Sequence, residues 1–202
     1  MMQRALSIDR TYFGEKHPNV AIRLNNLATL LTATERFEDA ESLLRHAISI
    51  DEASFGENHP NVAVNLSNLA QLLQATNRLP EAEPLMRHAL SIDEASFGEN
   101  HPNMAIRLNN LAQLLRATNR LEEAEPLMRR AIHLSLEFTE KTEHKNPNYS
   151  RQLGNYQGLL KEMGLSEQEI EQRIDETLNA KPDSESPVEM VERLLGPRPK
   201  SD

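Results

Sequence analysis

The chain has 202 residues, of which 38% are hydrophobic, 26% charged and only 4% aromatic. This scarcity of aromatic residues and of glycine favours closely packed helices over a globular core built on large rings. The formal net charge is −9, and no basic stripe is dense enough to follow a phosphate backbone, so we expect no nucleic-acid partner.

The absence of cysteine excludes disulfide bonds, thiol nucleophiles and thiolate metal sites. The N-terminus has no apolar core of signal-peptide length. Nowhere do about 18 apolar residues follow one another without interruption, as a transmembrane helix requires. We therefore expect a cytoplasmic protein without a membrane partner.

Residues 1–16 are predicted to be the second helix of a truncated N-terminal repeat. The segment Met1–Asp9 aligns with Leu85–Asp93, in the middle of a helix that is second in its own repeat. We interpret the chain as a fragment of a longer array or as a misplaced start, and the alternative is that half a pair suffices as a cap. An apolar face left uncovered there predicts weak head-to-tail self-association.

A repeat of 42 residues follows over residues 17–136. Phe-Gly-Glu recurs at Phe13, Phe55 and Phe97, and His-Pro-Asn recurs with the same interval. Residues 49–90 and 91–132 overlay without gaps and match at 34 of 42 positions. Such agreement predicts an array of three structural units.

Each unit is predicted to form two helices. Pro60 suits the first position of a helix and pushes His59 out of the α region. Asn77 tolerates positive φ and suits the stop of this first helix, as does its counterpart one repeat later, Asn119. The second helix is expected over about 80–95, with a mild bend at Pro84.

Residues 137–180 are predicted to be a degenerate fourth repeat that forms a C-terminal cap. Asn146–Asn148 replaces His-Pro-Asn with a displacement of three residues, and Ser166–Glu169 has a capping-box pattern. Residues 181–202 are expected to be a linker, a short amphipathic helix from Ser186 and a tail. A helix of about nine residues is too short to persist alone, so we expect loose docking or disorder, with a regulatory role as the alternative.

The repeat resembles a known family. Leu24–Ala28, Arg36–Glu41, Arg45–Ile48, Phe55–Gly56 and His59–Asn61 together resemble the 42-residue tetratricopeptide repeats of kinesin light chains, a variant that many bacterial arrays share. The resemblance covers residues 1–136 well and 147–180 weakly. It implies an all-α fold, a right-handed superhelical solenoid of antiparallel helix pairs, and a prokaryotic source.

No constellation of catalytic residues is found. The histidines His17, His59 and His101 occupy the same place in successive repeats, so they cannot converge on one metal ion, and we interpret them as residues at helix starts. H-E-x-x-H, G-x-S-x-G and glycine-rich phosphate-loop patterns are absent. We therefore predict no enzyme activity, no cofactor and no metal.

The predicted binding site is one face of each first helix. In tetratricopeptide arrays the matching positions line the concave groove, so the resemblance assigns these residues to peptide binding. Amides both donate and accept hydrogen bonds, and Arg23 and two further arginines are expected to recognise carboxylates. Some of these positions differ between repeats, at 65/107, 67/109 and 74/116, which favours a binding role over drift at tolerant surface sites. The predicted site consists of Asn25, Asn26, Thr29, Ser67, Asn68, Gln71, Gln74, Arg107, Asn109, Asn110, Gln113 and Arg116.

The sequence thus predicts a scaffold for protein–protein interaction that binds a peptide or protein segment, including acidic or aromatic-acidic segments of the kind that light-chain relatives bind. Two alternatives remain. The chain could be a regulatory or sensor module of a larger multidomain protein, or a structural array that associates with itself.

Overall fold

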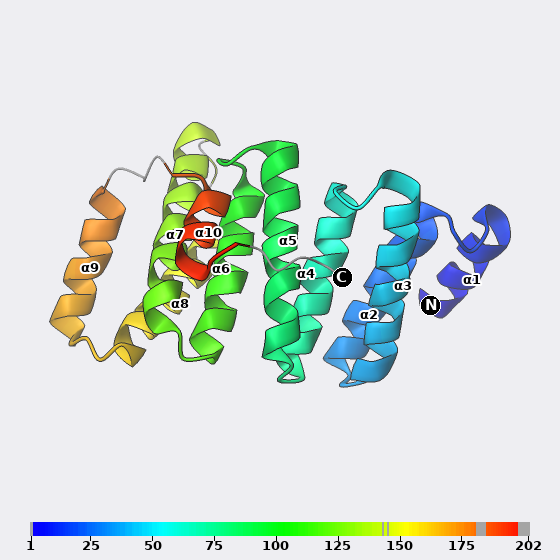
Figure 1. Cartoon of the computed structure of the whole chain (residues 1–202), viewed down its shortest axis with the longest axis horizontal. Helices are drawn as coiled ribbons and strands as arrows, with labels where there is room; N and C mark the ends of the chain where they lie inside the picture. The colour runs from blue at the N-terminus through cyan, green and yellow to red at the C-terminus, as the bar shows by residue number, and fades with distance from the viewer. Residues whose placement is uncertain (1, 143, 145, 181–184, 198–202) are drawn as a thin grey trace. The chain divides into compact units, whose positions relative to one another are not determined.

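The computed structural model describes residues 2–142, 144, 146–180 and 185–197 (Figure 1). Every regular element within these ranges is a helix. The chain divides into two compact units, residues 1–92 and 93–202, which are described separately. The helices are α1 (Met2–Phe13), α2 (Pro18–Ala33), α3 (Phe37–Phe55), α4 (Pro60–Ala75), α5 (Leu79–Phe97), α6 (Pro102–Ala117), α7 (Leu121–Thr142), α8 (Tyr149–Glu162), α9 (Glu167–Asn179) and α10 (Pro187–Leu195).

The first unit contains α1 to α4 and most of α5. In this unit α1 packs against α2, α2 against α3 and α3 against α4, and the first helices α2 and α4 also touch each other directly. Alanines at the contacts, such as Ala28, Ala40, Ala63 and Ala70, are fully buried. Because alanine is small, it lets helix backbones approach closely without leaving voids.

The His-Pro-Asn sequences start the first helices. His17, His59 and His101 are the N-cap residues of α2, α4 and α6, and each Nδ1 accepts a hydrogen bond of 3.2 Å from the backbone N–H of the asparagine two residues later. Each imidazole also stacks on the phenylalanine that ends the preceding helix, with ring centroids 4.4–4.6 Å apart. The interpretation of these histidines as helix-start residues is confirmed.

The first helices end at residues with positive φ. Asn77 has a φ of 60° and Asn119 of 59°, which confirms the predicted stops, and Glu35 adopts the same conformation. The second helices are longer than expected, since α5 begins at Leu79 and continues to Phe97 with Pro84 inside it. Proline at this depth removes a single backbone hydrogen bond near the helix start, so the helix continues.

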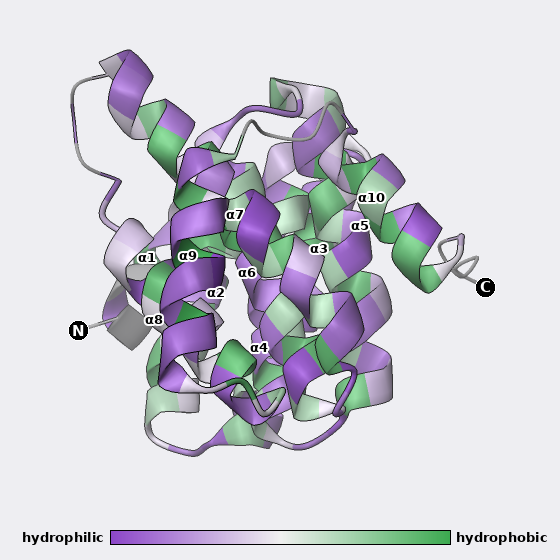
Figure 2. Cartoon of the chain, turned by 90° about the vertical axis from the view of Figure 1, so that its left-hand side faces the viewer, coloured by the Kyte–Doolittle hydropathy of each residue, from purple (hydrophilic) through white to green (hydrophobic). Residues whose placement is uncertain are grey.

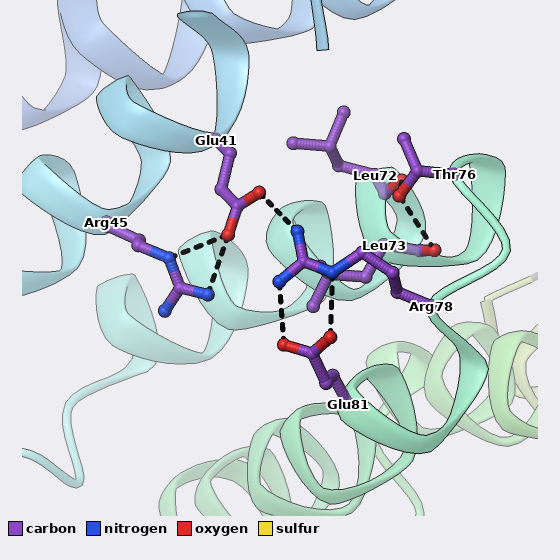
Figure 3. A network of polar contacts seen from close by, with 7 residues as sticks. All are labelled: Glu41, Arg45, Leu72, Leu73, Thr76, Arg78 and Glu81. Carbon is purple, nitrogen blue, oxygen red and sulfur yellow. Dashed lines mark hydrogen bonds and ion pairs between the residues drawn. The ribbon is translucent and has the colours of Figure 1, made fainter. Parts of the chain in front are cut away.

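A cluster of charged side chains connects successive repeats in the first unit (Figure 3). Arg78, in the turn before α5, donates to Glu41 of α3 over 2.6 Å and to both carboxylate oxygens of Glu81 over 2.7 Å. Arg45 donates to the other oxygen of Glu41 over 2.7 Å and 2.9 Å. Burial alone would raise the pKa of Glu41, but hydrogen bonds from Arg78 and Arg45 and their charges lower it overall.

The second unit contains α6 to α10. The pairs α6–α7, α7–α8, α8–α9 and α7–α9 are in contact, as are the first helices α6 and α8. Buried polar side chains connect the fourth helix pair, α8 and α9, to the helices before it. Ser135 of α7 donates to Gln152 of α8 over 2.6 Å, and Gln152 in turn donates to the carbonyl of Ala105 in α6 over 3.2 Å.

The last full pair is held by two further buried contacts. The hydroxyl of Tyr156 donates to Glu125 over 2.7 Å, and burial raises the pKa of Tyr156. A ring nitrogen of His133 in α7 lies 2.5 Å from the carbonyl oxygen of Thr177 in α9. Hydrophilic residues predominate along the visible side of α9 (Figure 2). That residues 137–180 form a C-terminal cap stays a prediction of the sequence.

The short helix α10 is docked. It packs against α7 and buries Pro187, Met190 and Val191. For this helix the sequence predicted loose docking or disorder, with a regulatory role as the alternative, and the docked position agrees with the first of these. The predicted linker at residues 181–184 and the tail at 198–202 lie outside the described residues.

One repeated contact differs between repeats. An aspartate near the end of each second helix faces the next first helix, and Arg107 donates to Asp93 over 2.8 Å as Arg23 does to Asp9. In the middle repeat the partner of Asp51 is instead Asn65, which donates over 2.7 Å. The sequence analysis placed positions 65 and 107 on an exposed or groove surface. This expectation is wrong, because these side chains are 3% and 9% exposed and face a helix contact.

Neutralisation of Asp93 and of Asp51 should change stability by different amounts. Asp93→Asn leaves Arg107 buried without this counter-charge, so we expect a loss of about 3 kcal/mol or more in the free energy of unfolding. Asp51→Asn is the matched control, because Asn65 can donate equally well to an amide oxygen, and it should change stability by less than about 1 kcal/mol. Urea unfolding followed by circular dichroism measures both. Equal losses in the two variants would contradict this account.

Asp51 also predicts a pH dependence. Burial raises its pKa above the ordinary value of 3.8, and the hydrogen bond from Asn65 and the charge of His59 only partly offset this effect. The folded chain therefore binds this proton more tightly than the unfolded chain. Stability from this group is fully present below the unfolded pKa and falls as pH rises toward the raised folded pKa. Between pH 3 and pH 7 the unmodified chain should therefore lose unfolding free energy relative to the Asp51→Asn variant, which has no carboxyl group to ionise at this position.

Candidate functional site

Residues of the predicted binding face meet between α2 and α4. The side-chain amide of Asn68 in α4 donates to the amide oxygen of Asn25 in α2 over 2.7 Å. One turn further along α2, the hydroxyl of Thr29 donates to the backbone carbonyl of Asn25 over 3.1 Å. Direct packing of the first helices thus brings side chains 43 residues apart into one polar surface.

A hollow of about 310 Å³ lies beside this amide pair. The first helices α2 and α4 provide its polar walls, while Leu44 of α3 and Leu72 of α4 are buried side chains that form its apolar part. None of its lining residues is charged. We call it the α2–α4 hollow, and it is lined by Thr29, Thr32, Ala33, Leu44, Asn68, Gln71 and Leu72.

Besides Asn25, three predicted residues of the first unit lie outside this lining. Asn26 is exposed, Gln74 is half-buried, and Ser67 is buried with 3% of its surface exposed. The hollow is therefore lined by Thr29, Asn68 and Gln71 of the predicted set, and Asn25 is hydrogen-bonded to Asn68.

The second unit has an equivalent amide pair. Asn155 of α8 donates to the amide oxygen of Asn109 in α6 over 3.0 Å. Asn109 is buried, whereas Asn110 and Gln113 are half-buried. The side-chain nitrogen of Gln113 is buried and has no hydrogen-bond partner among the residues that the structure describes.

The arginines of the predicted face are engaged within the chain. Arg116 donates to both carboxylate oxygens of Glu162 over 2.7 Å and 2.5 Å, and these bonds lower the pKa of Glu162. Arg107 is paired with Asp93, and Arg23 with Asp9. Sequence analysis expected these guanidinium groups to recognise a ligand's carboxylates, but each already binds a carboxylate of its own chain.

Asn155 and Glu162 were missed by the sequence analysis. A signal for Asn155 existed, because it follows Asn146 by nine positions as Asn110 follows His101. Glu162 has no equivalent in the other repeats and could not be found in this way. A second hollow, of about 480 Å³, lies near it and is lined by Asn119, Arg120, Leu121, Glu122, Glu123, Glu162 and Met163.

Two absences hold for the part of the chain that the structure describes. Within it, no group of three or more histidine, aspartate or glutamate residues could hold a metal ion. None of the helices described there is both long enough and apolar enough to cross a membrane.

Comparison with known proteins defines the family. The tetratricopeptide repeat model matches residues 1–53, 24–95 and 62–137, which together exceed half of the chain. The chain belongs to the tetratricopeptide repeat family. Among proteins of curated function, no match of significance to this tetratricopeptide repeat chain is found.

Solved structures share the fold of this tetratricopeptide repeat chain. BtubC (BKLC) from P. vanneervenii is 20% identical with a TM-score of 0.74, over 100% of this chain and 75% of that one. A protein of nearly identical TPR-like repeats from Podosopora anserina, whose name links it to kinesin light chains, is 19% identical with a TM-score of 0.66. A variant form of that protein is 18% identical with a TM-score of 0.68, and both forms align over 88% of this chain and 82% of theirs.

These matches confirm the fold class and the resemblance to kinesin light chain-type repeats. Tetratricopeptide repeats are in general protein-interaction modules, and scaffolds of this kind are typically not catalytic.

Two glycines of α8 provide a test of the Arg116 contact. A Cβ atom at Gly158 would lie 3.3 Å from both terminal nitrogens of Arg116, whereas a Cβ at Gly154 would meet nothing within 4 Å. Gly154→Ala should therefore raise the free energy of unfolding by about 0.5–1 kcal/mol, the usual gain within a helix. Gly158→Ala should lose most of this gain because the guanidinium of Arg116 must move. Thermal unfolding of both variants measures the difference, and equal gains would show that Arg116 is not held against α8.

Proposed function

We propose that this tetratricopeptide repeat chain binds an extended segment of a partner protein at the α2–α4 hollow. The observation that supports the proposal is the placement of hydroxyl and amide groups around a small apolar depression. Thr29 and Gln71 are exposed there and Asn68 is half-buried, so their polar atoms are accessible to a ligand.

The amide pair leaves hydrogen-bonding capacity for a peptide backbone. Asn68 uses one N–H group on Asn25, so its side-chain oxygen and second N–H group are available for a ligand. Gln71 lies one turn away on the same helix and offers another donor and acceptor. An extended backbone alternates donors and acceptors, which suits recognition by such side-chain amides.

The size and charge of the hollow define its occupant. A volume of about 310 Å³ lies at the small end of the range for ligand pockets, roughly 300–1,000 Å³. Because Leu44 and Leu72 line it and no lining side chain is charged, we propose that one uncharged side chain of the segment enters it. An acidic side chain would lose hydration there without gaining a counter-charge.

Panning random displayed peptides against the intact chain tests the proposal. Thr29→Arg places a long charged side chain at the hollow, so the enriched peptides should bind this variant at least about tenfold more weakly, a loss of roughly 1.4 kcal/mol. Ser42→Arg adds the same side chain at an exposed position of α3 outside the lining and should leave binding unchanged. Fluorescence anisotropy of labelled peptides measures both affinities.

Peptides that bound Thr29→Arg as tightly as the unmodified chain would show that the hollow does not hold the segment. Loss of binding in both variants would point to a general effect of added positive charge. Self-association, a prokaryotic source and a regulatory role within a larger protein stay predictions of the sequence.

A further inference from the structure

The helix α10 occupies a surface formed by second helices of the second unit. Met190 and Val191 are 1% and 2% exposed, and Pro187 is buried beside them, while α7 is the helix that α10 packs against. The end of α5 takes part through Glu94, which lies against the first turn of α10. None of these residues lines the α2–α4 hollow.

The contact with Glu94 completes the N-terminus of α10. The first turn of a helix leaves backbone N–H groups without partners inside the helix. In α10 the hydroxyl of Ser186 accepts from the N–H of Glu189 over 3.2 Å, and Pro187 has no N–H to satisfy. The N–H of Val188 remains, and it donates to a carboxylate oxygen of Glu94 over 2.9 Å. A negative carboxylate is also favoured by the helix dipole at this end.

Helix α10 is too short to be stable by itself. It has nine residues, and isolated helices shorter than about 12–15 residues do not persist in water. Only three of its residues are fully buried, so this contact belongs to the parts of a fold that open most readily. Tethering keeps the helix near its surface at an effective concentration on the order of millimolar. A partner helix of higher intrinsic affinity can therefore replace it.

We propose that the surface of α7 together with Glu94 is a second binding site, which takes a short amphipathic helix of a partner protein. In the free chain α10 occupies this site and shows the chemistry that it accepts. The partner helix has an N-terminal turn with an N–H group free for Glu94. It presents adjacent apolar side chains, as Met190 and Val191 do, to α7.

The test uses the full chain and a labelled peptide of residues 185–197. Met190→Asp with Val191→Asp in the full chain undocks α10 and exposes its site. This opened variant should bind the peptide at least about tenfold more tightly than the unmodified chain, in which tethered α10 competes. Fluorescence anisotropy measures binding. The same peptide carrying both aspartates should not bind, because it lacks the apolar side chains that enter the surface.

A matched pair of receptor changes tests the role of the carboxylate. Glu94→Gln in the opened variant removes the negative charge at the helix N-terminus and should weaken peptide binding by about three- to tenfold. Glu52 occupies the equivalent position one repeat earlier, so Glu52→Gln is the control and should leave binding unchanged. Equal effects of the two substitutions would overturn the assignment of Glu94.

A second variant distinguishes release of α10 from a folding defect caused by the two aspartates. Met190→Ala with Val191→Ala removes the same contacts without adding charge and should also bind the peptide more tightly than the unmodified chain. Absence of peptide binding to both variants, each with unchanged helical circular dichroism, would overturn the proposal. So would a dimer of the unmodified chain in light scattering that dissociates in these variants, because the occupant would then be α10 of a second copy.

Discussion

A helix pair of a repeat array cannot bury its apolar face alone, and in the described part of this chain the helices bury that face against their neighbours. The alanine-rich sides of α2, α3 and α4 are covered only because successive helices pack against one another. Burial in such an array accumulates from neighbour to neighbour, as is general in repeat proteins. The turns serve this packing, since each His-Pro-Asn start is capped by its own histidine and stacked on the preceding helix.

The same packing creates the candidate site. Because α2 and α4 touch directly, Asn25 and Asn68 meet as a hydrogen-bonded pair, and Asn109 and Asn155 meet in the same way in the second unit. The pairs orient the amides while leaving part of their hydrogen-bonding capacity accessible. The charged residues of these helices are used differently. The arginines Arg23, Arg107 and Arg116 form ion pairs within the chain. None of the side chains that line the α2–α4 hollow is charged.

In the second unit, buried polar contacts connect the less regular helices α8 and α9 to the helices before them. This fourth helix pair departs from the repeat consensus and is held by these contacts. Gln152 of α8 donates to a backbone carbonyl of α6, and His133 of α7 contacts a backbone carbonyl of α9. Helix α10 also depends on contacts with other helices, because it is too short to persist alone. A carboxylate from α5 accepts from its first turn, and an apolar surface on α7 covers its buried side. A contact of this kind is specific yet easily opened, which makes it suitable for exchange with a partner.

The sequence by itself determined the helical class, the 42-residue period, the helix starts at His-Pro and the left-handed stops, because proline, asparagine and apolar spacing act locally along the chain. Thr29, Asn68 and Gln71 were selected by the resemblance of the repeats to tetratricopeptide arrays, in which the matching positions line the groove. Only the tertiary structure decided which of the selected side chains remain accessible. In the sequence, Arg107 and Arg116 cannot be told apart from arginines that are free to bind a ligand, but in the structure they form ion pairs with Asp93 and Glu162. Such pairings depend on which helices pack together, and no local pattern encodes that.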